Sequence, residues 1–114
     1  MSNEFLDHLE DIIDAMEKAE LAITEVEYER FADDFMINFV VIRALEIVGE
    51  ATKRLPLSIR TQYPHVPWKD MAGMRDRIIH GYDSVDLQIV WNVVKNEIPR
   101  IKPIIQQILR DYGV

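Results

Sequence analysis

Apolar residues recur at intervals of three and four along nearly the whole chain, and this spacing restricts the fold more than any other feature. Such a spacing lines up apolar side chains on one face of an α-helix, whereas a half-buried strand alternates at every second residue. No segment sustains that alternation together with turn residues, so strands are not expected. The sequence predicts an all-α fold, an up-and-down bundle of four long helices and one short helix.

The breaks in the apolar pattern predict where these helices lie. Long helices are expected at residues 3–24, 27–54 and 68–79 and from residue 83 or 84 to about 108, with a short one at 58–63. The second is apolar almost all round between Phe31 and Val48, which is typical of a helix that is covered on most sides. Pro99 and Pro103 lie within the last apolar stripe and predict a kink or a break there.

Length and composition indicate one ordinary folded domain spanning residues 1–114. Cysteine is absent, and the N-terminus shows no basic leader followed by an apolar run, so a cytoplasmic protein is expected. No apolar run approaches the length of a membrane span. A net charge of −7 argues against broad, non-specific nucleic-acid binding but leaves room for a small basic cleft.

The segment from Arg75 to Tyr82 gathers more chemically capable groups than any other part of the chain. Arg75 shares a helical face with apolar residues, and a guanidinium binds phosphate through a bidentate fork. His80 is expected in the last helical turn, where the helix dipole favours the protonated imidazole, and Gly81 is expected to end that helix. Asp76 lies four residues before His80 and could orient its ring, and Tyr82 follows closely enough to share a cleft.

These groups suit cleavage of a phosphodiester by an attacking ribose 2′-hydroxyl, which needs a proton shuttle and a cation at phosphorus. His80 and Arg75 would fill the two roles. The simpler interpretation is equally open on spacing alone, because histidine and arginine are common near helix C-termini. The metal-binding spacings HExxH and CxxC are absent, so neither a metal nor a cofactor is expected.

A charged stripe interrupts the apolar second helix at Arg43, Glu46 and Glu50, which are spaced at i, i+3 and i+7. One interpretation is a solvated face with ion pairs within the helix. The other is that the stripe lines the same cleft and orients Arg75 or His80. A third possibility is a dimerisation module without activity, in which Arg75 pairs with Glu46 or Glu50.

The pattern Arg75-x4-His80-x-Tyr82 resembles the Arg-x4–6-His motif of HEPN-domain ribonucleases, with the tyrosine typical of the HepT toxin branch. The resemblance extends to the segment Arg43–Ala51, to the block Pro67–Tyr82 and to the order of the residues that follow, and it covers about residues 4–110. It implies a HEPN-like helical domain with Arg75 and His80 as the catalytic pair of a metal-independent endoribonuclease. Asp76 takes the place after the arginine where that family favours a polar residue.

The same resemblance implies partners. Members of that family form homodimers in which the two motifs face a shared cleft, and the substrate is RNA. HepT toxins are paired with a minimal nucleotidyltransferase antitoxin that transfers AMP to the motif tyrosine, here Tyr82. The alternative is a non-catalytic helical partner that binds a nucleotidyltransferase or a nucleotide.

Overall fold

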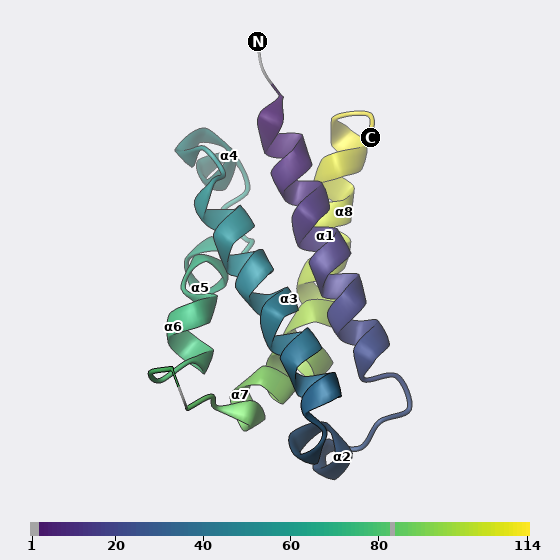
Figure 1. Ribbon diagram of the computed structural model, residues 1–114. Helices are drawn as coiled ribbons and strands as arrows, with labels where there is room; N and C mark the ends of the chain where they lie inside the picture. Colours follow the sequence, from purple (N-terminus) through teal and green to yellow (C-terminus); the bar gives the residue numbers. More distant parts are fainter. Residues whose placement is uncertain (1–2, 83) are drawn as a thin grey trace.

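Three long helical runs lie side by side in the computed structural model, which describes residues 3–82 and 84–114 (Figure 1). The runs are α1 (Glu4–Ala22), α3 (Phe35–Lys53) and the continuous succession α7 (Leu87–Asn92), η1 (Val93–Glu97) and α8 (Ile98–Asp111). Within the described part of the chain, four short helices accompany these runs: α2 (Tyr28–Asp33), α4 (Leu57–Gln62), α5 (Trp68–Ala72) and α6 (Met74–Ile78). The described residues form no strand beyond one isolated bridge, which confirms the predicted all-α, up-and-down bundle.

The helix predicted at residues 27–54 is broken at Asp34, so that prediction was wrong in its continuity. Asp34 has extended backbone angles, and its carboxylate accepts a hydrogen bond from the backbone N–H of Met36 at 2.9 Å. The buried amide of Asn38 donates to the carbonyls of Phe31 and Ala32, at 3.1 and 3.3 Å. The Asp34 side chain therefore caps the start of α3, and the Asn38 side chain pairs with carbonyls in the last turn of α2.

The helix predicted at residues 68–79 is also divided. Gly73 separates α5 from α6, and α6 ends at Ile78, one residue earlier than expected. The next helix begins later than expected, because Asp86 caps α7 by accepting a hydrogen bond from the backbone N–H of Ile89 at 3.1 Å. Ser84 is not the cap, and Asp83, the other predicted cap, lies outside the described residues.

The irregularity predicted near Pro99 takes the form of a π-helical stretch, η1. In a regular α-helix the ring of Pro99 would collide with the carbonyl of Lys95, four residues earlier. The wider π turn avoids this contact, and its i→i+5 bond runs from the N–H of Ile98 to the carbonyl of Val93. Pro103 lies inside α8, which continues to Asp111.

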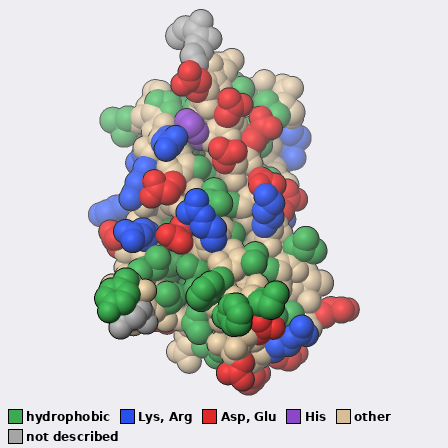
Figure 2. All heavy atoms as spheres, in the orientation of Figure 1, with side chains coloured by type: hydrophobic (Ala, Val, Ile, Leu, Met, Phe, Trp, Pro, Cys, Tyr) green, Lys and Arg blue, Asp and Glu red, His purple; other side chains and the backbone are tan. Residues whose placement is uncertain are grey.

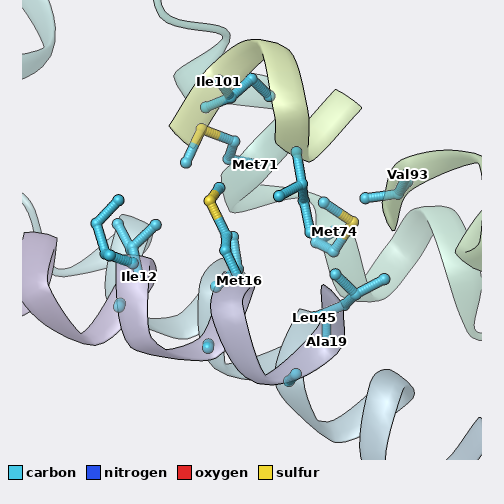
Figure 3. Close-up of a cluster of buried hydrophobic side chains, with 14 of the residues drawn as sticks. Ile12, Met16, Ala19, Leu45, Met71, Met74, Val93 and Ile101 are labelled. Carbon is cyan, nitrogen blue, oxygen red and sulfur yellow. The ribbon is translucent and has the colours of Figure 1, made fainter. Parts of the chain in front are cut away.

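The core lies where the three long runs face one another and α5 and α6 close the side. Ile12, Met16 and Ala19 of α1 lie in one cluster with Leu45 of α3, and the Met71 and Met74 side chains of α5 and α6 belong to the same cluster, near Ile101 and Val93 (Figure 3). Flexible methionine side chains suit such a junction between non-parallel helices. No helix among the described residues combines the length and the apolar character that crossing a membrane requires.

One face of α3 remains uncovered, contrary to the expectation that this helix is covered on most sides. Its four large exposed residues form what we call the α3 apolar face: Phe35, Met36, Phe39 and Val40, exposed by 64%, 72%, 66% and 49%. Hydrophobic side chains gather over the N-terminal half of α3 and below a belt of charged side chains (Figure 2). Within one chain, then, the apolar stripe of α3 is only partly buried.

Gly49 brings α3 unusually close to α5 and α6. It is buried, and a Cβ atom at this position would lie 3.3 Å from the backbone oxygen of Met71 and 3.4 Å from the Cβ of Met74. The backbone of α5 therefore approaches α3 more closely than a side chain at position 49 would comfortably allow. This contact fixes how α6, which carries Arg75, sits against α3.

We expect α5 and α6 to move away from α3 when Gly49 is replaced by a larger residue. Gly49→Val places branched methyl groups against a backbone oxygen that cannot rotate away, and such overpacking costs about 1–3 kcal/mol. Chemical denaturation should show a lower free energy of unfolding for Gly49→Val, with a smaller change for Gly49→Ala, whose single methyl needs a shift of a few tenths of an ångström. Unchanged stability of the valine variant would show that the contact is not tight.

Candidate active site

Arg75 lies in the first turn of α6 and is held from α3. Its Nε atom is 3.8 Å from Oε2 of Glu46, and the two side chains are 62% and 25% exposed. This distance is an ion pair rather than a hydrogen bond, so the N–H groups of the guanidinium are left for another acceptor. Such an exposed pair contributes little to stability, about 0–1 kcal/mol, but it restricts where the guanidinium can lie.

An open hollow of about 810 Å³ lies beside this pair, between α3 and the segment from α6 to α7. Its lining combines charged and apolar residues and comprises Phe39, Ile42, Arg43, Glu46, Arg75, Asp76, Ile79, Gly81, Tyr82 and Val85. Two guanidinium groups thus reach the same hollow from different helices. Its volume is in the range of sites that hold small organic ligands, about 300–1,000 Å³.

The loop after α6 is closed by backbone pairing. The N–H of His80 donates to the carbonyl of Ser84 at 2.7 Å, the N–H of Asp86 donates to the carbonyl of Ile78 at 2.8 Å, and Ile79 pairs with Val85. Gly81 has a φ of 92°, so its left-handed conformation belongs to this loop and does not end the helix as predicted. Tyr82 projects from the loop and is 100% exposed.

His80 is placed differently from the prediction. It lies two residues beyond the end of α6, so it is outside the last helical turn. Its side chain is exposed, and it is not among the residues that line the hollow, although both neighbours, Ile79 and Gly81, are.

The supporting residues divide into two groups. Arg43 and Asp76 line the hollow together with Glu46 and Arg75, whereas Glu50 is exposed and lies outside the lining. The described residues show no hydrogen bond or ion pair between Asp76 and His80. The two residues do not share a helical face, because α6 ends before His80. The stripe on α3 is therefore brought to the hollow at Arg43 and Glu46 but not at Glu50.

Arg77 shows how differently two neighbouring arginines are used. It forms a bidentate pair with Glu97, with Nη1–Oε1 and Nη2–Oε2 distances of 3.1 and 2.8 Å, and so joins α6 to η1. The hydrogen bonds to Glu97 raise the pKa of Arg77 above its ordinary value. Arg77 thus has a structural role, whereas the N–H groups of Arg75 are available to a ligand in the hollow.

The sequence reasoning missed the apolar part of the hollow. Phe39, Ile42, Ile79 and Val85 were assigned no site role, and the helix carrying the first two was interpreted as covered. One signal was available, because Phe39 precedes Arg43 by four residues and Glu46 by seven and so lies on the same face.

The other histidines stay apart from this region. His8 lies on α1 and is half-buried, and the exposed His65 lies in the loop before α5, with its ring centroid 6.4 Å from that of Tyr63. Within residues 3–82 and 84–114, no three acidic or histidine side chains are grouped in a way that could hold a metal ion.

Comparison with known proteins identifies the family. The profile described as "Ribonuclease HepT-like" matches residues 12–108, which include every helix of the bundle at least in part. The chain belongs to the HepT-like ribonuclease family. The predicted resemblance is therefore confirmed at the level of the family.

Curated relatives support the same assignment over most of their lengths. "Probable ribonuclease HepT" of Thermococcus cleftensis is 44% identical over 102 residues, which cover 90% of this chain and 93% of the relative. "Putative RNase MJ1216" of Methanocaldococcus jannaschii is 44% identical over 103 residues, with coverage of 90% and 85%. "Putative RNase TTE0752" of Caldanaerobacter subterraneus is 37% identical over 103 residues, with coverage of 90% and 92%. No solved structure matches the chain significantly.

Proposed function

We propose that this protein is a metal-independent endoribonuclease and the toxin of a toxin–antitoxin pair. Membership in a ribonuclease family supports the reaction class. The observation that carries the proposal is the placement of Arg75, which faces a two-arginine hollow, is restrained by Glu46 and has no hydrogen-bond acceptor among the described residues. A guanidinium with free donors beside a second cation is suited to a phosphodiester.

In the proposed reaction the ribose 2′-oxygen attacks the adjacent phosphorus and the bond from phosphorus to the 5′-oxygen breaks. The 2′-hydroxyl loses a proton, the leaving 5′-oxygen gains one, and a 2′,3′-cyclic phosphate and a 5′-hydroxyl result. Arg75 stabilises the negative charge that develops on the phosphoryl oxygens. His80 acts as the general acid or base, and its exposed position on the adjoining loop leaves the ring accessible to a strand that crosses the rim of the hollow.

Arg75→Ala and His80→Ala should each abolish cleavage while leaving the fold intact. Both side chains are exposed, so neither change opens a cavity. The measurement is cleavage of end-labelled transfer RNA and total RNA in EDTA, with circular dichroism as the check of folding. His65→Ala, which alters an exposed histidine outside the hollow, is the matched control and should cleave normally. Cleavage retained by both site variants would reject the assignment, and binding of a nucleotidyltransferase without any cleavage would favour the non-catalytic alternative.

The proposed antitoxin is a minimal nucleotidyltransferase that modifies Tyr82. The phenolic oxygen would attack the α-phosphorus of ATP, forming tyrosyl-AMP and releasing pyrophosphate. Full exposure of Tyr82 supports its accessibility to such an enzyme, and its place in the lining of the hollow supports inhibition. A phosphate attached there would add negative charge beside Arg75 and Arg43, where substrate phosphate would bind.

Incubation with such a nucleotidyltransferase and ATP should add AMP to the Tyr82 peptide, as measured by mass spectrometry. Ribonuclease activity should fall in proportion to the modified fraction. Tyr82→Phe should resist modification, whereas Tyr112→Phe, which changes a tyrosine at the end of α8, should be modified normally. Modification of the Tyr82→Phe protein would place the acceptor elsewhere.

The protein is further proposed to act as a homodimer whose contact includes Phe35, Met36 and Val40 of the α3 apolar face, with Phe39 left facing the hollow. A cluster of large exposed apolar side chains on one helix is the usual mark of an interaction surface. This face borders the hollow, because Phe39 belongs to both, so a second copy bound there would bring two hollows near each other.

Met36→Glu should convert the dimer to a monomer, since it places a charge in the middle of the α3 apolar face. Light scattering coupled to gel filtration measures the mass. Leu57→Glu, at a residue of α4 that is 75% exposed, is the matched control and should leave the dimer unchanged. A wild-type protein that is monomeric at all concentrations tested would contradict the proposal.

A further inference from the structure

Phe39 has no role in the core of the chain, yet it forms part of the hollow that contains Arg75. Phe39 is 66% exposed, so removing its ring would leave no buried cavity. The ring packs edge-on against Phe35, with centroids 5.8 Å apart and planes at 69°. An aromatic face that lies beside two guanidinium groups is therefore available to a ligand.

The position of Phe39 relative to Arg43 matches the two ends of a nucleotide. The residues are four apart on α3, so they lie on one face and about 6 Å apart along the helix axis. Arg43 supplies a cation for phosphate, and Phe39 supplies a flat apolar surface one turn away. Half-buried Ile42, Ile79 and Val85 extend the apolar surface within the same hollow.

We propose that Phe39 is the platform on which an unpaired base of the RNA stacks while the adjoining phosphate is held by Arg43 and Arg75. This inference rests on the proposed ribonuclease function and names the recognition element within it. Base–aromatic stacking tolerates any base, because every base has a π-face. The stacked base must leave its own helix, so the site selects single-stranded RNA over duplex, in which the bases are stacked inside.

The chain provides a matched control for this role. Phe35 is 64% exposed on the same face of the same helix, but it does not line the hollow. A loss of apolar surface or a disturbed contact between copies would affect Phe35→Leu and Phe39→Leu alike. Only stacking inside the hollow distinguishes them.

The experiment measures binding of a fully 2′-O-methylated oligoribonucleotide, which cannot be cleaved, as a single strand and annealed to its complement. Phe39→Leu should weaken single-strand binding about 5- to 100-fold, the range expected for the loss of one stacked base. Phe39→Tyr, which keeps the ring, and Phe35→Leu should both remain within about twofold of the wild type. The duplex should bind more weakly than the single strand, and Phe39→Leu should change its affinity little.

Salt dependence separates stacking from charge. Phe39→Leu should keep the slope of log affinity against log salt, whereas Arg43→Ala should reduce it by about 0.7, the value for one phosphate contact on a single strand. Equal losses in Phe39→Leu and Phe35→Leu, or no loss in Phe39→Leu, would overturn the inference. Because the probe cannot be cleaved, a stacking effect in a protein without nuclease activity would reject the proposed function alone.

Discussion

The approach of α3 to α5 and α6 at Gly49 determines the geometry of the site. A side chain at that position would touch the backbone oxygen of Met71, so the absence of one lets α6 settle beside α3. One turn before Gly49, Glu46 then meets Arg75 at 3.8 Å. An ion pair this exposed contributes too little to hold two helices together. The placement of Arg75 is therefore a consequence of backbone packing, and Glu46 selects among the positions that the packing allows.

Most of the bundle could be predicted because amphipathic spacing is a local property of the chain. The spacing could not show where helices are interrupted by contacts between distant residues. The break at Asp34 depends on Asn38, whose amide reaches back to the carbonyls of Phe31 and Ala32. The stretch before Pro99 was predicted as irregular, and the structure shows how the irregularity is resolved, by widening the helix over η1 rather than by ending it.

The site was predictable in its composition and less so in its geometry. Arg43, Glu46 and Arg75 could be related because helical spacing assigns them to faces, and the structure places all three at one hollow. His80 could not be located in the same way, because the end of α6 is set by the pairing of Ile79 with Val85 and by the bond from Asp86 to Ile78. These bonds join residues on the two sides of the loop, and sequence spacing carries no information about them.

The apolar sequence of α3 indicates that its side chains are to be covered, but it does not say by which molecule. The buried side is covered by the chain itself, while Phe35, Met36, Phe39 and Val40 remain exposed. Large apolar side chains on a surface carry a cost in solubility and are retained where something binds. Phe39 lies where this face meets the cationic hollow, so one helix can present an apolar surface to a second copy and an aromatic ring to RNA.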